Sequence, residues 1–340
     1  MSRRALILIN YRSSSLALDA IRSARAASAE PVQVVVVDNT VDSQEAAALR
    51  GVCDVLLTPS RNLGYAAAIN LARRSTEAEL LIVSNPDVVF DAGAIDALDI
   101  GVPVAGPALF WDRALTWRLP PSDRYGTAER LDAAIASRNR GRALARDRRR
   151  FRHRVAFWTA TSTSRQPAIS GAVMAIRAEA FDDAGGFDER YFLYFEETDF
   201  LRRVPAVWHV PAARCRHLFN QSAAGSDEAA RHYAESERKY LERWSGKLAT
   251  RVIKSLERHA APPGEDFMEG RILLDRDDVV IEASPLPSFE TAAGLFPAGR
   301  EVEIPSEVWS TYRQEVLYFR VVERTSGQVL ARYARRRMGA

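Results

Sequence analysis

The chain has 340 residues, with 47 Lys and Arg against 44 Asp and Glu, so its formal net charge is 47 − 44 = +3. Hydrophobic residues make up 47% and charged residues 27%, which excludes disorder as the main state. No apolar run approaches the length of a membrane span, about 18 residues, and two cysteines exclude a disulfide framework or a thiolate zinc cage. The nearly balanced charge does not favour nucleic-acid binding, and a reducing cytoplasm fits the cysteine content best.

The first hundred residues alternate between runs typical of buried strands and runs with apolar residues at helical spacing. The predicted strands are 5–10, 32–39 and 79–87, and the predicted helices are 15–27 and 66–75. This alternation predicts an α/β fold with a mostly parallel, doubly wound sheet, in which ligands bind at the carboxyl ends of the strands. The first candidates for a site are therefore the polar residues at these ends: Asn10, Asp38, Asn39, Asn85 and Asp87.

Two common kinds of nucleotide-binding site are disfavoured in this region. A dinucleotide-binding turn needs glycines directly after the first strand, but that strand is followed by NYRSSS, and the chain has no GxxxxGK[ST] phosphate loop. A carboxylate such as Asp38 can instead accept a hydrogen bond from the imide N–H of uracil or thymine. Asp87 could hold Mg²⁺ or Mn²⁺, which prefer oxygen ligands. Each of the two could equally be a helix cap or a turn residue.

The middle of the chain has a looser pattern and one strongly basic segment. Residues 138–154 hold nine Arg, one His and one Asp. Such a run is typical of a solvated helix face or a mobile loop, or else of a patch that contacts phosphate groups or an anionic membrane surface, and both interpretations stay open. Trp111 and Trp117 could stack on sugar rings in an acceptor cleft or simply pack in a core.

Acidic and aromatic residues gather most densely at 169–203. A short strand is predicted over 206–211, and 228–258 are predicted to form one long helix, with an apolar stripe typical of a core or interface.

A linker is predicted at 260–266, and after it the apolar residues recur with a period of two. Short strands are predicted over 271–274, 278–283, 301–304, 315–323 and 329–334, with a hairpin turn at 324–328. The predicted organisation is therefore a first domain of residues 1–225, a helical segment 226–260 and a small β-rich domain 265–340 without an assigned chemistry.

Seven short segments occur in the order typical of one enzyme family. They read ILINYRS, VVVVDNTVDS, RNLGYAAAIN, VSNPDVVF, SGAVMAIRAEAF, GGFDERYFLYFEETDF and RCRH, and they lie within residues 5–220. Each segment is weak alone, but together and in this order they make the chain resemble the rhamnosyltransferase-like branch of glycosyltransferase family 2. The resemblance implies a GT-A fold, and the residues after 260 lie outside it.

The resemblance also implies roles for single residues. Asp38 resembles the carboxylate that reads the pyrimidine base, and Asp87 resembles the last Asp of the family's DxD-type motif, a metal ligand. In this chain the first acid of that motif is Asn85, which leaves fewer carboxylates for the metal. His217 resembles the His that often completes the metal or diphosphate site. Further contacts to the donor nucleotide are implied for Asn10, Asn39, Asp42, Arg61, Asn62, Gly64 and Asn85.

The segment FEET resembles the family's acidic triplet, whose last carboxylate is the catalytic base. In this chain that position is Glu197, where the family usually has Asp, and Asp199 is implied to support it. The extra methylene of Glu moves the carboxylate by one C–C bond, about 1.5 Å. The residues implied to border the donor and acceptor cleft are Ser170, Gly171, Asp188 and Glu196.

The resemblance implies an inverting, metal-dependent transfer of a sugar from a dTDP- or UDP-activated donor, with L-rhamnose as the best single choice. The cofactor would be Mg²⁺ or Mn²⁺, and the acceptor a saccharide, a lipid-linked saccharide or a small metabolite. The protein is expected in the cytoplasm, with possible peripheral contact to the inner face of the membrane through residues 138–154, and a homodimer is a further possibility.

Two other functions are compared with this one. The protein could be a catalytically weakened nucleotide-sugar-binding or scaffold protein that acts through its C-terminal β domain, since NPD replaces the acidic motif. A sugar nucleotidyltransferase would share the fold class, but it needs a Gly-rich, basic loop after the first strand, which this chain lacks.

Overall fold

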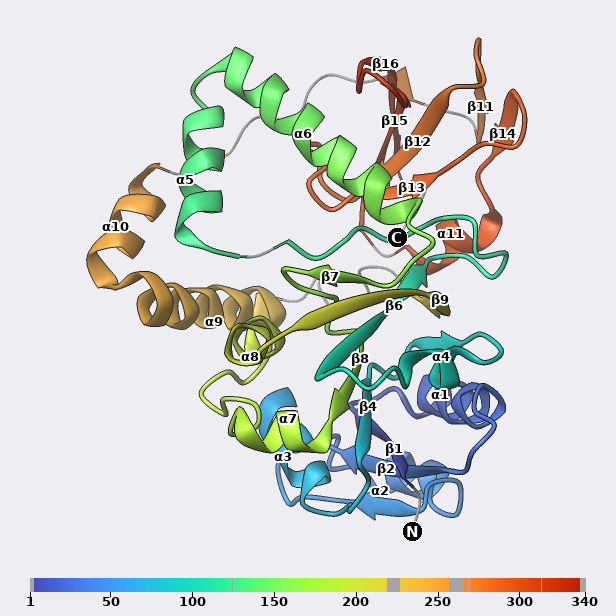
Figure 1. Cartoon of the computed structure of the whole chain (residues 1–340), viewed down its shortest axis with the longest axis vertical. Coiled ribbons are helices and arrows are strands. Elements are labelled where there is room, and N and C mark those ends of the chain that lie inside the picture. Colours follow the sequence, from blue (N-terminus) through green and yellow to red (C-terminus); the bar gives the residue numbers. More distant parts are fainter. Residues whose placement is uncertain are drawn as a thin grey trace.

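The computed structural model of the chain describes residues 3–123, 125–218, 227–256, 266–267, 270–312 and 314–336 (Figure 1). One large sheet is built from nine strands: β1 (Arg4–Asn10), β2 (Val32–Asp38), β3 (Val55–Leu57), β4 (Leu80–Ser84), β5 (Val88–Phe90), β6 (Val104–Phe110), β7 (Ser164–Gln166), β8 (Val173–Arg177) and β9 (Val207–His217). The predicted α/β fold with a doubly wound sheet is confirmed. The predicted strand over 79–87 is shorter in the structure: β4 ends at Ser84, where the NPD turn begins, and β5 follows that turn.

The strand order of this sheet is β3-β2-β1-β4-β8-β6-β9-β5, and β7 pairs with β9. Strands β3, β2, β1 and β4 are parallel to one another, as are β6 and β9. Strand β8 is antiparallel to both β4 and β6, and β5 and β7 are antiparallel to β9. The parallel half of the sheet therefore brings the carboxyl ends of β1, β2 and β4 to one edge, where ligands are expected.

Helices cover both faces of this sheet. They are α1 (Ser14–Ala26), α2 (Ser43–Leu49), α3 (Tyr65–Arg73), α4 (Ala94–Leu98), α7 (Ala178–Asp183) and α8 (Glu196–Arg203). Strands β1, β2 and β4 have buried residues on both faces, which explains their unbroken apolar sequence. Among the described residues, no helix combines the length and the apolar composition that crossing a bilayer requires.

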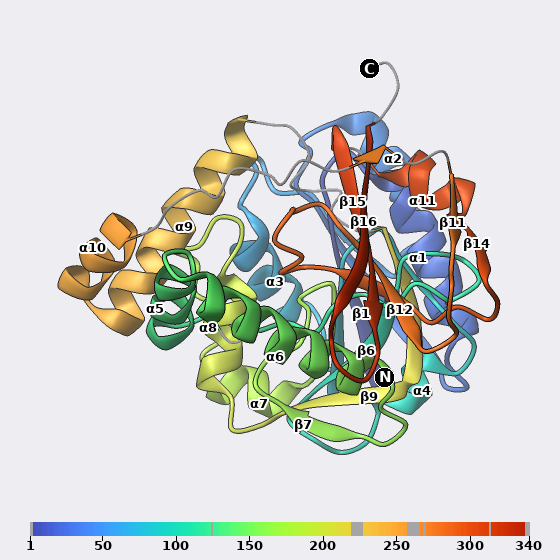
Figure 2. The ribbon, with the colours of Figure 1, turned by 90° about the horizontal axis from the view of Figure 1, so that it is seen from above.

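Four further helices stand beside the sheets: α5 (Thr127–Ala136), α6 (Arg140–Trp158), α9 (Asp227–Ser245) and α10 (Lys247–Leu256). The prediction of one long helix over 228–258 is wrong, because Gly246 separates α9 from α10. Its φ of +83° lies in the left-handed region that glycine adopts at low cost, so it ends α9 and lets the chain turn. Figures 1 and 2 show α9 and α10 at the outer edge of the molecule.

The C-terminal strands form two small sheets. A five-stranded sheet has the order β10-β16-β15-β12-β13, and β11 pairs with β14. The elements are β10 (Asp266–Phe267), β11 (Arg271–Leu273), β12 (Val279–Ser284), β13 (Ala293–Leu295), β14 (Glu301–Glu303), α11 (Ser306–Thr311), β15 (Val316–Glu323) and β16 (Val329–Arg336). The predicted strands and the hairpin between β15 and β16 are confirmed, whereas β10, β13 and α11 were not predicted. The predicted linker at 260–266 lies, apart from residue 266, outside the described residues.

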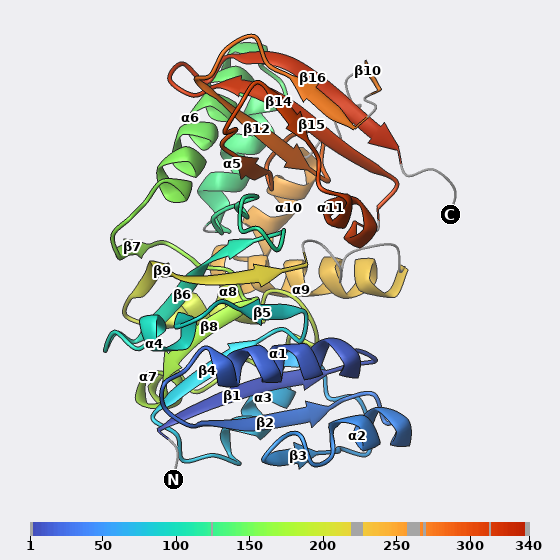
Figure 3. The ribbon, with the colours of Figure 1, turned by 90° about the vertical axis from the view of Figure 1, so that its right-hand side faces the viewer.

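One hydrophobic core joins the large sheet to the C-terminal sheet, which lies above β6 and β9 in Figure 3. Trp111 and Trp117, just after β6, are buried in this core. The Trp111 ring lies 6.0 Å from Tyr312, and the Trp117 ring meets Phe319 of β15 edge-on at 6.3 Å. Both tryptophans therefore pack, and neither lines an acceptor cleft. The predicted domain boundary near 225 stays a prediction, because 219–226 lie outside the described ranges.

The Arg-rich segment 138–154 forms most of α6, which covers the C-terminal sheet with Phe151 and Trp158. Arg154 is buried, and its Nε lies 2.6 Å from Oε1 of Glu282 in β12. Arg146, Arg149 and Arg150 pair with carboxylates of neighbouring elements. The segment is therefore a helix and not a loop: part of its charge stabilises the packing of α6, and the outer arginines face solvent.

Candidate active site

The carboxyl ends of β1 and β2 are joined by buried polar side chains. Asn10 and Asp38 are paired in the sheet register, and Nδ2 of Asn10 donates to Oδ1 of Asp38 at 3.0 Å. The same amide donates to Glu45, while its oxygen accepts from Ser13. Because Asn10 is fully buried and bonded within the chain, it fixes the position of Asp38 at the strand end.

The turn at 61–64 is held against this strand end by Asn39. Nδ2 of Asn39 donates to the carbonyl of Gly64 at 3.0 Å, and its Oδ1 accepts from the backbone N–H of Leu63 at 3.3 Å. Gly64 has a φ of +79°, and a Cβ built there would lie 2.5 Å from the carbonyl oxygen of Phe192. Only glycine fits this turn, so its sequence requirement is geometric. Asn62 accepts from the Gly64 N–H at 2.9 Å.

Tyr65, the first residue of α3, was not among the predicted site residues, although it stands in the segment RNLGY. Its hydroxyl donates to Oδ1 of Asn85 at 3.1 Å. Burial raises the pKa of the Tyr65 phenol, and the charges of Glu196, Glu197 and Asp87 raise it further. The phenol therefore stays neutral and lies close to three carboxylates that the chain contributes from distant segments.

Asp87 and His217 meet because β5 pairs with β9, where Val88 lies opposite His217. Nε2 of His217 lies 3.4 Å from Oδ1 of Asp87, and both side chains are mostly buried. Asn85 is tied to the neighbouring segment, since its N–H donates to the Ala172 carbonyl at 2.9 Å. This places Asp87, His217 and Asn85 beside the start of β8.

Glu196 and Glu197 begin α8, where the helix dipole favours negative charge. The two residues before them, Tyr194 and Phe195, have φ values of +69° and +67°. Consecutive left-handed residues with large side chains are costly, and such backbone strain is found most often at functional sites. Here it turns the chain so that both glutamates enter the helix together.

Gly171 makes room for Glu197. A Cβ on Gly171 would lie 2.7 Å from Cγ of Glu197, which is closer than real Cβ atoms approach, and 3.1 Å from its Cβ. Ser170 accepts from the Ala172 N–H at 3.2 Å and so shapes the same turn. Since Ala172 also binds Asn85, the turn 170–172 connects Glu197 with the Asp87–His217 pair.

The two glutamates share an unusual environment. Burial raises the pKa of Glu196 well above its ordinary value, and the neighbouring Glu197 charge raises it further. Burial also raises the pKa of Glu197. Oε2 of Glu196 is buried and has no hydrogen-bond partner among the described residues. Carboxylates with raised pKa values in a partly buried position are candidates for proton transfer.

Four predicted residues lie apart from this cluster or face away from it. Asp42 is exposed and caps α2 by accepting from the Gln44 N–H at 2.7 Å, and Arg61 is also exposed. Asp188 turns its carboxylate to Arg190, at 2.5 Å, and to Arg243 of α9. These ion pairs link its loop to α9, and its place at the border of the cleft stays a prediction.

Asp199 is fully buried, and its carboxylate is occupied by neighbours on the far side of α8. It accepts from Nε of Arg203 and from Nε1 of Trp244, both at 2.9 Å, and Arg243 lies 3.0 Å away. These contacts hold α8 against α9, and the predicted support of Glu197 by Asp199 stays a prediction.

The arrangement combines three chemical elements at one edge of the sheet. A pyrimidine-reading carboxylate could act at Asp38, a divalent cation could bind between Asp87 and His217, and Glu197 is a candidate base. Among the described residues, Asp87, His217 and Glu197 lie in one region together with Tyr65 and Gly171. Such a set suits the displacement of a diphosphate by a hydroxyl group.

Comparison with known proteins is consistent with this chemistry. No family model matches the sequence. The chain is similar to the N-acetylglucosaminyl-diphospho-decaprenol L-rhamnosyltransferase of Mycobacterium tuberculosis, in strains CDC 1551 / Oshkosh and H37Rv. The identity is 31% over 243 residues, covering 63% of this chain and 75% of the relative.

Two solved structures have similar chains at low identity. GalNAc-T7 with UDP, GalNAc and Mn²⁺ is 13% identical, with a TM-score of 0.45, and the match covers 83% of this chain and 62% of that one. The mannosyltransferase PcManGT of Pyrobaculum calidifontis, in complex with GDP-Man and Mn²⁺, is 14% identical, with a TM-score of 0.41, covering 75% and 74% of the two chains.

Proposed function

Because the chain belongs to glycosyltransferase family 2, in its rhamnosyltransferase-like branch, and is a glycosyltransferase, we propose that it transfers L-rhamnose from dTDP-L-rhamnose with inversion. The acceptor is a hydroxyl of a lipid-linked saccharide. The relative from M. tuberculosis is named for an N-acetylglucosaminyl-diphospho-decaprenol acceptor, which supports this class of acceptor here. The scaffold alternative loses support, because the C-terminal sheet shares its core with the large sheet.

One observation carries the proposal. Glu197 lies against Gly171, and the next residue of that turn, Ala172, accepts a hydrogen bond from the N–H of Asn85, in the segment of Asp87. A base and a diphosphate site must lie on opposite sides of one reacting carbon in an inverting transfer. The contacts between these segments, which are far apart in the sequence, support such an arrangement.

Asp87 and His217 fit a divalent cation that is shared with the donor. Within the described part of the chain, no group of three or more His, Cys, Asp or Glu side chains is arranged to hold a metal ion. Two protein ligands suffice for Mg²⁺ or Mn²⁺ when diphosphate oxygens and water complete the coordination. Such an ion neutralises negative charge on a leaving diphosphate.

Glu197 accepts the proton of the acceptor hydroxyl as that oxygen attacks the anomeric carbon. Its raised pKa makes it a better proton acceptor than an exposed glutamate, as long as it is deprotonated. Attack opposite the diphosphate inverts the anomeric configuration in one displacement. Asp38, fixed by Asn10, is the candidate for reading the imide N–H of the thymine ring.

Calorimetric titration with dTDP, UDP and GDP, each with Mn²⁺ and again with EDTA, tests the donor site. We expect metal-dependent binding of dTDP, and loss of that binding in Asp87→Ala. Folded protein that binds none of the three nucleotides would contradict the proposal, and preference for GDP would contradict the pyrimidine donor.

The base is tested separately with Glu197→Gln, which keeps the size of the side chain. We expect unchanged dTDP affinity and a loss of transfer of at least about a hundred-fold. Glu77→Gln, at an exposed position, is the matched control. Transfer at the wild-type rate in the Glu197 variant would show that another group takes the proton.

A further inference from the structure

The corner formed by α9 and α10 leaves one face of α10 open. On this face Leu248 has 76% and Val252 46% of its surface exposed. Lys247 and Arg251 are exposed too, and they stand one residue before Leu248 and Val252, respectively. Since residues four apart lie above one another on a helix, a cationic stripe runs directly beside an apolar stripe. We call these four residues the α10 face.

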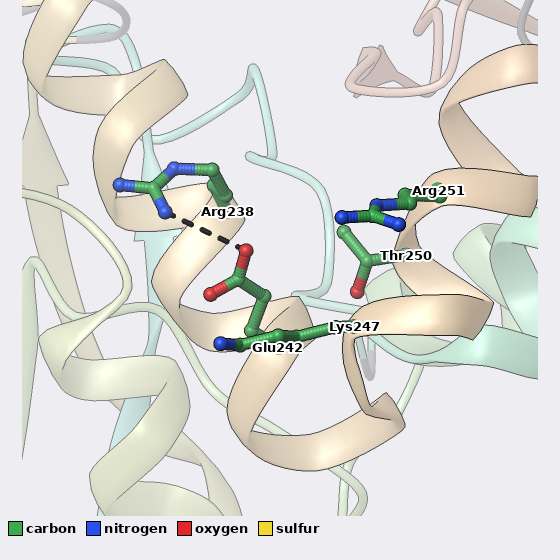
Figure 4. A pocket seen from close by; sticks show the side chains of 5 residues that line it. All are labelled: Arg238, Glu242, Lys247, Thr250 and Arg251. Atoms are coloured by element: carbon green, nitrogen blue, oxygen red, sulfur yellow. Dashed lines mark hydrogen bonds and ion pairs between the residues drawn. The ribbon is translucent and has the colours of Figure 1, made fainter.

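A basic groove between α9 and α10 adjoins this face (Figure 4). Its lining residues are Arg238, Glu242, Lys247, Thr250 and Arg251. Glu242 lies 3.5 Å from Arg238, and three cations face this one carboxylate, so the lining carries an excess of positive charge. Lys247 and Arg251 have no ion-pair partner within the described ranges. Their charge is therefore available to an external anion.

We propose that the α10 face binds the surface of a bilayer rich in anionic phospholipids. Leu248 and Val252 enter the interfacial region, and Lys247, Arg251 and Arg238 contact the phosphates of the headgroups. Surface-binding helices combine these features, because burial of apolar side chains and attraction to anionic lipid act together. The long side chains of Lys and Arg reach around the apolar residues toward the phosphates.

The charges select a lipid surface over a second copy of the chain. In a two-fold symmetric dimer through this face, Lys247 and Arg251 would meet the same residues of the partner, and like charges would repel. The outer arginines of α6 are a weaker candidate for membrane contact. The exposed positions of that helix offer apolar surface mainly at Leu144, whereas the α10 face has two large apolar residues one turn apart.

This surface is connected to the candidate active site by α9. Tyr233 of α9 contacts the rings of Tyr194 and Phe195, directly before Glu196. From Tyr233 to Ser245, where α9 ends beside α10, the helical rise amounts to about 18 Å. A bilayer bound at the α10 face would therefore lie at a fixed distance from Glu197. The inference goes beyond the proposed transfer reaction and does not depend on it, since lipid binding needs neither donor nor acceptor.

The test is sedimentation of the full-length chain with vesicles of phosphatidylglycerol and phosphatidylcholine in equal amounts, compared with pure phosphatidylcholine. We expect binding only to the anionic vesicles, weakened by salt. Each cation near such a surface is worth about a factor of five, so Lys247→Ala with Arg251→Ala should weaken binding about 25-fold. Leu248→Asp should weaken it as well. The control is Arg140→Ala with Arg142→Ala on α6, which removes the same charge and should leave binding unchanged.

Three results would overturn the proposal. The first is that the wild-type chain does not bind anionic vesicles. The second is that the α6 control loses binding as strongly as the α10 variant. The third is a dimer in light scattering that Leu248→Asp dissociates. Thermal unfolding of each variant shows that it is folded, which is expected because every substituted side chain is exposed.

Discussion

Gly171 and Glu197 fit together only because Gly171 has no side chain: a Cβ there would lie 2.7 Å from Cγ of Glu197. Gly171→Ala must therefore push the glutamate aside. We expect a fall in transfer rate of about 10- to 100-fold, because a shift of about 1 Å in a reacting group has this effect. Binding of dTDP should stay unchanged, since the Asp87 segment is not touched.

Gly299→Ala serves as the matched control, because a Cβ at that glycine meets no atom within 4 Å. Transfer rates and calorimetric affinities are measured for both variants. Wild-type transfer by the Gly171 variant would mean that the position of Glu197 is not important for the reaction.

Glu196 should destabilise the fold at neutral pH. Burial raises its pKa, so the folded state holds a proton more tightly than the unfolded state. Stability then falls as the pH rises from the ordinary value of 4.5 through the raised pKa. Glu196→Gln removes this charge, and we expect a gain of roughly 1–3 kcal/mol near pH 8 that vanishes near pH 4. Chemical denaturation at both pH values measures it.

The same variant should leave the acid limb of the transfer rate in place. Glu197 must be deprotonated to act as a base, so the rate falls on the acid side around its raised pKa. Because the Glu197 charge raises the pKa of Glu196, Glu197 loses its proton first, while Glu196 is still neutral. An acid limb that moves to lower pH in Glu196→Gln would show instead that Glu196 is already charged when Glu197 titrates.

Much of the fold could be predicted because its signals are local. β1, β2 and β4 are buried on both faces and so have unbroken apolar sequences. The role of α6 was missed, because its arginines pair with acids from other elements, such as Glu282, which lies 128 residues away from Arg154. Gly246 was a local signal that the prediction of one long helix overlooked.

The candidate site shows the same division. The strand ends suggested Asp38 and Asp87 from the residues alone, but His217 and Glu197 were found only through the family resemblance. Asp199 stands beside the acidic triplet and yet faces Trp244 of α9, a contact that no sequence pattern reveals. Tyr65 is a similar case, since an aromatic residue at a helix start reads as packing until its hydroxyl is seen on Asn85.

The buried ion pairs between α6 and the C-terminal sheet allow a further prediction. Glu282 accepts from Arg154 and from Nε of Arg320, both at 2.6 Å, and all three side chains are buried. Glu282→Gln removes the carboxylate that pairs with two buried guanidinium groups, which should cost about 3–5 kcal/mol of unfolding free energy. Glu315→Gln, which breaks the exposed pair with Arg336, should change stability by less than about 1 kcal/mol. Equal effects in urea denaturation would contradict this assignment.

The shared core predicts that the two sheets unfold together. Phe319 of β15 is fully buried and meets the edge of the Trp117 ring, which follows β6. Phe319→Ala should lower the unfolding free energy by about 3–5 kcal/mol while keeping one transition. Removal of residues 263–340 should give insoluble protein, because it exposes Trp111 and Trp117. Two separate transitions in calorimetry would show instead that the C-terminal sheet folds on its own.

His209 of β9 should make the protein sensitive to acid. Its ring stacks on Phe157 at 4.1 Å, and burial lowers its pKa from 6.5 to about 4. Between these values the unfolded chain binds a proton that the folded chain does not, so stability falls as the pH drops. The full difference between the two pKa values corresponds to about 3 kcal/mol of unfolding free energy. His209→Phe keeps an aromatic ring and cannot titrate, so the variant should lose less stability than the wild type between about pH 7 and pH 4. His153→Gln, at an exposed position of α6, should follow the wild-type curve. If urea denaturation gave the same acid dependence for the wild type and the His209 variant, the neutral state of this histidine would have no part in the acid sensitivity.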